Sequence, residues 1–183
     1  MSNQIDDIIL QCRENKAWAQ EKLFKLYAPK MLGICRRYLS SIDDARDAMQ
    51  DGFVKVFTNL HKYEGRSSFN TWITRIMMNT AIDMLKKLNK IQFVSDDNHL
   101  TTDNLSDEDY IEAPELNQTQ LLELIDNMPN GYKMIFNMYA IDGLSHKEIA
   151  NTLNISEGTS KSQLNRARAF LKTEINKIKE TLS

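Results

Sequence analysis

Apolar residues recur at intervals of three and four along several stretches of this 183-residue chain, which is the spacing of one face of an α-helix. The clearest stretch covers residues 43–60, and a second covers residues 68–89. Weaker patterns predict a helix over residues 23–38, interrupted near Pro29, and a short helix over residues 5–18. We therefore expect the first half of the chain to form a small helical bundle with its own core.

The two strongest stretches also have distinct outer faces. In the 68–89 stretch the side chains expected to be buried are Phe69, Trp72, Ile73, Ile76, Met77, Thr80, Ala81, Met84 and Leu88. Its opposite face is mostly basic and carries Arg75, Asn79, Lys86 and Lys87. The outer face of the 43–60 stretch carries Asp47, Gln50, Asp51 and Val54. Solvation and the helix dipole explain such faces without a ligand, whereas phosphate contact is the functional alternative for the basic one.

A short segment, residues 63–69, joins these two stretches. It combines a flexible glycine, a cation, two hydroxyls and flanking aromatic rings, in the order Tyr-Glu-Gly-Arg-Ser-Ser-Phe. Such a set could stack on an unpaired base and hydrogen-bond its edge. An ordinary turn between helices is the simpler interpretation, so the segment alone decides nothing.

The second half of the chain shows the pattern of a helix-turn-helix. Two short amphipathic stretches lie between Leu121 and Gly143. Ser145 and Glu148 then form an S-x-x-E capping box, which specifies a helix start, and residues 154–156 supply a tight turn. The helix that follows is expected to bury Leu164, Ala167, Leu171, Ile175 and Ile178 and to point outward Lys161, Ser162, Asn165 and Arg166. The second helix of such a motif reads the major groove of DNA, although a plain bundle with a basic surface shows the same pattern.

Composition places the chain among folded helical proteins. Hydrophobic residues make up 42% and charged residues 26%, and six Gly and three Pro are too few for an all-β fold rich in turns. We expect an all-α protein of two small helical domains. No apolar run approaches the ~20 residues that cross a bilayer, and the N-terminus lacks a signal-peptide pattern, so we expect no membrane insertion. Two cysteines, Cys12 and Cys35, fit a reducing cytoplasm.

The sequence offers no recognisable catalytic or metal site. It contains no glycine-rich phosphate loop, no His and Cys set at metal-ligand spacing and no nucleophile with a paired base. We expect His146 to be a solvent-facing residue in the first turn of its helix. The chain is therefore predicted to be no enzyme and to need no cofactor or metal.

A net charge of −2 hides an uneven distribution. Residues 1–90 hold 15 basic and 10 acidic side chains, residues 91–132 hold ten acidic and no basic ones, and residues 133–183 hold eight and five. The three segments carry +5, −10 and +3. Blocks of like charge with few apolar residues do not bury enough surface to fold. We predict a domain over residues 1–90, a flexible acidic linker over residues 91–117 and a second domain over residues 118–183.

Several longer motifs resemble a known family. Residues 23–39, 43–53 and 69–79 look like the second conserved region of bacterial sigma factors, and residues 156–168 resemble the fourth. The order of these regions, and the short chain with no extra domain between them, are similar to the extracytoplasmic-function group. The resemblance covers nearly the whole folded chain, and two independent motifs agree.

This resemblance implies an alternative sigma factor, which binds core RNA polymerase and directs promoter-specific initiation of transcription. The face that docks on the clamp helices of the largest polymerase subunit corresponds to Asp47, Gln50, Asp51 and Val54. The loop that captures a flipped base of the -10 element corresponds to Gly65, Arg66, Ser67 and Ser68. Along the same melted strand would lie Arg75, Asn79, Lys86 and Lys87. The positions that read the -35 element correspond to Lys161, Ser162, Asn165 and Arg166. An anti-sigma factor is a common further partner in this family.

The chain departs from the family pattern in two places. The loop has Arg66 and two serines where many members carry an acidic residue, so its base preference does not follow from the family. Ser160 replaces a usual apolar residue, and Gln163 replaces a usual arginine. We expect these two changes to weaken backbone contacts with DNA.

Two other functions remain open on the sequence. A stand-alone helix-turn-helix regulator would bind duplex operator DNA tightly without polymerase, usually as a dimer. A protein-interaction module or adaptor would have a protein partner but no dependence on promoters.

Overall fold

The computed structural model describes residues 2–88 and 117–182. Every regular element within these ranges is a helix, which confirms the predicted all-α class. The chain divides into two compact units, Met1–Asn89 and Lys90–Ser183, called here the N-terminal and C-terminal units. The predicted linker, residues 91–117, lies outside the described residues except for its last one, so the linker and the predicted domain boundaries stay predictions.

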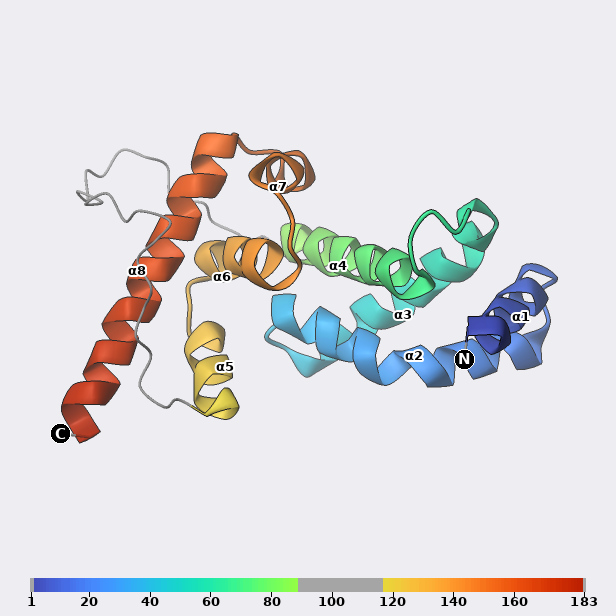
Figure 1. The fold of residues 1–183 in the computed structure, drawn as a ribbon, viewed down its shortest axis with the longest axis horizontal. Coiled ribbons are helices and arrows are strands. Elements are labelled where there is room, and N and C mark those ends of the chain that lie inside the picture. Colours follow the sequence, from blue (N-terminus) through green and yellow to red (C-terminus); the bar gives the residue numbers. More distant parts are fainter. Residues whose placement is uncertain (1, 89–116, 183) are drawn as a thin grey trace. The chain divides into compact units, whose positions relative to one another are not determined.

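The N-terminal unit is a bundle in which three helices pack on one another (Figure 1). Its described elements are α1 (Ser2–Arg13), α2 (Ala17–Tyr38), α3 (Ile42–Asn59), the 3-10 turn η1 (Leu60–Lys62) and α4 (Phe69–Lys87). Each of α2, α3 and α4 contacts the other two, and α1 packs on α2 and on η1. The helical bundle predicted for this half is therefore present.

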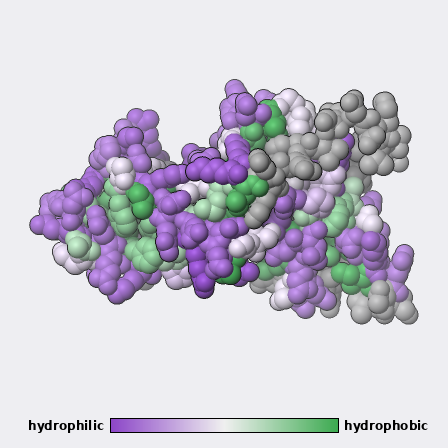
Figure 2. All heavy atoms as spheres, turned by 180° about the vertical axis from the view of Figure 1, so that it is seen from behind, coloured by the Kyte–Doolittle hydropathy of each residue, from purple (hydrophilic) through white to green (hydrophobic). Residues whose placement is uncertain are grey.

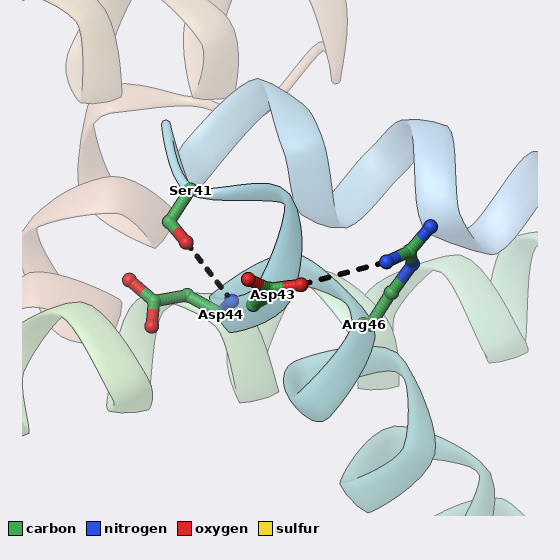
Figure 3. A network of polar contacts seen from close by, with 4 residues as sticks. All are labelled: Ser41, Asp43, Asp44 and Arg46. Atoms are coloured by element: carbon green, nitrogen blue, oxygen red, sulfur yellow. Dashed lines mark hydrogen bonds and ion pairs between the residues drawn. The ribbon is translucent and has the colours of Figure 1, made fainter.

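A serine cap fixes the start of α3. Ser41 lies in extended backbone just before the helix, and its Oγ accepts a hydrogen bond from the backbone N–H of Asp44 at 3.3 Å (Figure 3). Arg46 pairs with Asp43 at 3.4 Å on the exposed first turn. The cap satisfies one N–H that the helix itself leaves without an acceptor.

The packing of α3 on α4 depends on a glycine. Gly52 is buried, and a methyl group added there would overlap with Sδ of Met77, which is fully buried on α4. The Met77 side chain therefore occupies the space that a larger residue at position 52 would fill. Lys55 ties the same helices together at their surface, because its Nζ donates to Oγ1 of Thr80 at 3.1 Å and lies 3.6 Å from the carboxylate of Asp83.

The buried stripe predicted for α4 is partly wrong. Met78, Ile82 and Leu85 are buried although none was expected to be, whereas Leu88 is 42% exposed. The predicted core residues Trp72, Ile76 and Met84 are only half-buried. The physical reason is that α4 contacts both α2 and α3, so its buried arc is wider than the single stripe assumed and is centred differently.

Two predicted helix boundaries are also wrong. Helix α2 continues through Pro29 without interruption. Pro29 is exposed, so water can bond the carbonyl that loses its intrahelical donor. The short helix expected over residues 5–18 instead ends at Arg13, and Asn15 adopts a left-handed conformation with φ of 58° before α2 begins. Asparagine tolerates this conformation better than most residues, which explains the break.

Both cysteines belong to the core of the N-terminal unit. Cys35 is fully buried, and Cys12 is buried as well. Burial raises the pKa of the Cys35 thiol to about 12 and also raises the pKa of Cys12. Both side chains are therefore uncharged thiols at neutral pH.

The C-terminal unit consists of short helices packed on one long helix (Figure 1). Its described elements are α5 (Gln118–Asp126), α6 (Asn130–Phe136), the π-helical turn η2 (Asn137–Ile141), α7 (His146–Leu153) and α8 (Glu157–Leu182). The apolar cluster that joins α5 to α8 consists of Leu124, Ile125, Met128, Ala167, Leu171 and Ile175. Helix α5 begins three residues before Leu121, because Asn117 and Gln120 form a capping box that the sequence reasoning missed.

Hydrophilic side chains cover most of the face drawn in Figure 2, and hydrophobic ones gather there only in small groups. Within the described ranges, no helix combines the length and apolarity that crossing a membrane requires.

We expect Gly52→Ala to destabilise the N-terminal unit by about 1–3 kcal/mol, because the added methyl group forces Met77 or the helices apart. Gly33→Ala is the matched control. Gly33 is exposed on α2, and an added Cβ there meets no atom within 4 Å, so this change should stabilise the unit by about 0.5–1 kcal/mol. Both tryptophans, Trp18 and Trp72, lie in the N-terminal unit, so tryptophan fluorescence during urea unfolding reports on it. Equal stability of the two variants would contradict the close packing.

Candidate nucleic-acid interface

The outer face of α3 presents the four residues predicted to dock on a protein partner. Asp47, Gln50, Asp51 and Val54 are all exposed, and Val54 is 65% exposed. Their spacing places them along one side of the helix over two turns. The structure thus brings the four together on one acidic surface with an apolar residue at its end, called here the docking face.

An aromatic cluster supports the loop between η1 and α4. The rings of Tyr63, Phe69 and Trp72 lie within contact of one another, with centroids 5.4–5.7 Å apart. The ring of Tyr27 packs edge-on against Phe69 at 5.3 Å, which ties the cluster to α2. Phe69 and Tyr27 are buried, whereas Tyr63 and Trp72 are half-buried, so part of the cluster's surface faces solvent beside the loop.

The loop itself, residues 64–68, is exposed throughout. Gly65 has φ of +76°, a left-handed conformation that favours glycine. Arg66 pairs with Glu64 at 2.7 Å, and both side chains are mostly exposed. Ser68 has a structural task as well, because its Oγ accepts a hydrogen bond from the N–H of Thr71 at 3.1 Å and caps α4. The loop therefore offers the paired Glu64 and Arg66, and Ser67, as accessible polar side chains.

The outer face of α4 is basic, as predicted. Arg75, Asn79, Lys86 and Lys87 are all exposed along the helix, and the two lysines lie in its last turn, where the helix dipole favours positive charge. The same face could follow the phosphates of a nucleic-acid strand.

Between α3 and α4 lies a cavity of about 310 Å³. It is lined by Lys55, Asn59, Lys62, Trp72, Ile76, Asn79 and Thr80. Of these, only Asn79 was predicted to belong to the site. Lys55 and Asn59 are four residues apart on the second half of the 43–60 stretch, so the helical period places them on one face, whereas Lys62 lies in η1 beyond that stretch.

In the C-terminal unit, α7 and α8 form the predicted helix-turn-helix. Asn154 ends α7 in a left-handed conformation with φ of 58°. Ser156 starts α8, because its Oγ accepts a hydrogen bond from the N–H of Thr159 at 2.9 Å. The predicted capping box of Ser145 and Glu148 is confirmed at the start of α7. The connection between α7 and α8, residues 154–156, is therefore held at both of its ends, which limits the angle between the two helices.

The residues expected to point outward from α8 differ in exposure. Lys161 is exposed, whereas Ser162, Asn165 and Arg166 are half-buried. Oγ of Ser162 donates to the carbonyl oxygen of Thr159 at 3.1 Å, so this hydroxyl bonds to its own helix. Because α8 packs against both α6 and α7, these three side chains lie at the margin of its outer face.

Ser160 and Gln163 are fully buried, so these two polar side chains lie in the core of the C-terminal unit, and the expected weakening of DNA contacts stays a prediction. One expectation about this motif is wrong. His146 is half-buried rather than solvent-facing: its ring stacks on Tyr139 with centroids 4.6 Å apart, and Nδ1 lies 2.9 Å from Oγ of Ser160. The hydroxyl of the buried Ser160 is thus satisfied by a residue on the neighbouring helix. A pattern read along one helix does not show such a contact between two helices.

Within the described part of the chain, no group of His, Cys, Asp and Glu residues could hold a metal ion.

Two family models match the chain. The first, described as "Sigma-70 region 2", matches residues 23–91, and the second, "Sigma-70, region 4", matches residues 118–171. Among curated proteins, the chain is 26% identical to the ECF RNA polymerase sigma factor SigW of Bacillus subtilis, over 97% of this chain and all of the relative. It is 29% identical to the ECF RNA polymerase sigma-E factor of Escherichia coli strain K12, over 97% of this chain and 98% of the relative.

Solved structures support the fold. The sigma factor RpoE of Bartonella quintana, in complex with the anti-sigma factor NepR, aligns with a TM-score of 0.52 and 18% identity over 86% of this chain and 96% of that one. CnrH, in complex with the cytosolic domain of CnrY, aligns with a TM-score of 0.50 and 18% identity over 92% and 95%.

The chain belongs to the extracytoplasmic-function group of the sigma-70 family, and it is an alternative sigma factor that directs transcription initiation by RNA polymerase at promoters. The family is one of non-enzymatic initiation factors. This assignment, which covers both units, decides against the stand-alone helix-turn-helix regulator.

We expect Ser160→Ala to destabilise the C-terminal unit by about 1–2 kcal/mol, because it removes the hydrogen-bond partner of a half-buried imidazole nitrogen. His146→Phe keeps a ring against Tyr139, and the double variant His146→Phe/Ser160→Ala should cost less than the sum of the two single changes. Hydrogen exchange of the α7 and α8 amides, measured as denaturant is added, gives the free energy of unfolding of the C-terminal unit in all three variants. Strictly additive costs would show that the two side chains do not interact.

Proposed function

We propose that the N-terminal unit docks on core polymerase and captures the melted -10 element, while α8 of the C-terminal unit reads the -35 element. One observation carries the proposal: the docking face of α3, the exposed loop and the basic face of α4 belong to one packed unit. A partner held by α3 is therefore held at a defined orientation to any strand that lies along α4.

In this proposal the docking face contacts the clamp helices of the largest polymerase subunit. Asp47 and Asp51 supply negative charge one turn apart, Gln50 supplies an amide between them, and Val54 adds an apolar contact. Exposed charges that become desolvated in an interface govern both its register and its lifetime. All four side chains are available for this role, because α3 is held to the bundle by its opposite face.

We expect Asp47→Ala/Asp51→Ala to weaken binding to core polymerase at least tenfold, because two charges in one interface each contribute on the order of 1 kcal/mol or more. Asp7→Ala removes an exposed carboxylate from α1 and is the control, with affinity expected to be unchanged. Fluorescence anisotropy of labelled chain with core polymerase gives the affinity, and circular dichroism verifies the fold. An unchanged affinity of the double variant would exclude the docking face.

The proposed DNA contacts of the N-terminal unit begin at the loop. A flipped base would stack beside the aromatic cluster, with Gly65, Arg66, Ser67 and Ser68 around it. Stacking of a base on aromatic side chains contributes ~1–3 kcal/mol per base, enough to trap a spontaneously opened pair without nucleotide hydrolysis. The same strand would then pass Arg75, Asn79, Lys86 and Lys87, whose exposure and charge support phosphate contact.

The proposed -35 contacts come from the N-terminal half of α8. Lys161 and Arg166 could reach phosphates or guanine edges, and Asn165 could reach a base or a phosphate. Ser162, whose hydroxyl already bonds to the helix backbone, would contact DNA through a weaker second bond.

Arg166→Ala should separate these two modes of contact. If the guanidinium binds a guanine edge, the holoenzyme should lose about 1–3 kcal/mol at one position of the -35 element and tolerate other bases there. If it binds phosphate, all promoters should weaken alike, with a smaller dependence on salt. Lys172→Ala, an exposed lysine further along α8, is the control. Normal promoter affinity at every sequence would remove Arg166 from the site.

Neither unit carries a strong positive charge, so we propose that polymerase makes two weak DNA contacts act as one bivalent contact. The acidic residues of 91–117 would pass through the basic RNA-path channel of polymerase and stand in for RNA phosphates. We further propose that the chain acts in the cytoplasm, catalyses no reaction of its own, needs no cofactor and is restrained by an anti-sigma factor. The similar structure of RpoE contains the anti-sigma factor NepR, and that of CnrH contains the cytosolic domain of CnrY, which supports the last of these roles.

Reconstituted transcription tests the proposal as a whole. Core polymerase, with and without the chain, is given a pool of templates that carry random upstream sequences. We expect new transcripts only when both are present, and sequencing of the productive templates should reveal two conserved elements. Transcripts that depend on the chain but come from templates with no conserved -35 element would overturn the role of α8.

A further inference from the structure

The side chain of Arg13 joins two distant parts of the N-terminal unit. Arg13 is the last residue of α1, and its guanidinium reaches a segment 47–50 residues further along the chain. Nε donates to the carbonyl oxygen of Leu60 at 3.3 Å, and a terminal nitrogen donates to the carbonyl oxygen of Tyr63. These two carbonyls bracket the η1 turn. Because a guanidinium holds its donors in a fixed plane, one side chain restrains both ends of the turn together.

Tyr63 carries this restraint into the loop. Its backbone is bonded to Arg13, and its hydroxyl donates to the carbonyl oxygen of Ser67 at 2.9 Å. Its ring packs against Phe69 and Trp72, which begin α4. Residues 64–67 therefore form a loop that is closed across its base by one tyrosine.

The loop has little else to hold it. Every residue from Glu64 to Ser68 is exposed, and Gly65 at its tip has a conformation that few other residues adopt. An exposed loop without packing of its own takes its direction from the bonds at its ends. At the start of the loop, the Arg13 guanidinium bonds the carbonyl oxygens of Leu60 and Tyr63. Across the loop, the Tyr63 hydroxyl bonds the carbonyl oxygen of Ser67, and at its end Ser68 caps α4.

We infer that Arg13 and Tyr63 are positioning residues for the loop that captures the unpaired base. The inference rests on the proposed function of that loop. Arg13 lies before the region that the family model matches, residues 23–91, so the family match assigns it no role. Without the two bonds of Arg13 the unit stays folded, because its core lies elsewhere, but the loop samples more conformations and binding must first order it.

The test uses holoenzyme reconstituted from core polymerase and the full chain. The probe is a pool of fork-junction DNAs, in which a duplex selected with the unaltered holoenzyme continues into an unpaired non-template strand of random sequence. We expect Arg13→Ala and Tyr63→Phe to weaken binding about tenfold and to flatten the base preference at one unpaired position. Preferences within the duplex should not change.

Two further variants make the result specific. Arg13→Lys can donate to only one of the two carbonyls at a time, so it should restore part of the lost preference. Arg36→Ala removes an exposed arginine from the last turn of α2 and should leave every preference intact. The control separates a loss of positioning from a general loss of positive charge.

The double variant Arg66→Ala/Ser67→Ala tests the loop directly. If it flattens the preference at the same position and Arg13→Ala does not, the loop reads the strand without help from Arg13, so the inference is wrong and the proposed function stands. If the double variant changes no preference, the loop does not read the strand and both are wrong. If Arg13→Ala also flattens the duplex preferences, Arg13 supports the whole unit and the inference is overturned.

Discussion

The contact between α3 and α4 at Gly52, where the missing side chain leaves room for Met77, joins the two helices that carry the outer faces of the N-terminal unit. Met77 fills the space above that glycine, and Lys55 ties the two helices again at the surface through Thr80 and Asp83. The two helices display different outer surfaces, one acidic and one basic. In the proposed function, this packed pair of helices converts the binding of one protein partner on α3 into a fixed placement of the basic surface of α4 beside the DNA strand.

The loop and the helix-turn-helix are held by a different kind of interaction. In each, polar bonds join separate segments of the chain: Arg13 bonds the carbonyls around η1, and His146 on α7 bonds the buried Ser160 on α8. Such bonds contribute modestly to stability, yet they decide where exposed side chains point. Because neither unit carries a strong positive charge, the proposed contacts with DNA depend on positioning more than on bulk attraction.

Local signals explain why much of this could be predicted from the sequence. Ser41 and the Ser145–Glu148 capping box start their helices through hydrogen bonds between residues three positions apart in the sequence. Helices α3 and α7 therefore begin where the sequence indicates. The docking face and the basic face follow from the helical period alone. Tertiary contacts account for the failures: the arc that α4 buries depends on two neighbours, the burial of Ser160 depends on α7, and the fork of Arg13 depends on a turn 47 residues away.

The most direct measurement compares the affinity of one promoter duplex for the chain alone and for its holoenzyme, in one buffer at near-physiological salt. For the chain alone we predict binding at the level of non-specific complexes, with Kd of ~10⁻⁴–10⁻⁶ M and no preference for the promoter over scrambled DNA. For the holoenzyme we predict Kd in the range of specific complexes, ~10⁻⁸–10⁻¹¹ M, with a clear preference. Promoter-specific binding by the chain alone, as tight as that of the holoenzyme, would contradict the claim that polymerase unites two weak contacts.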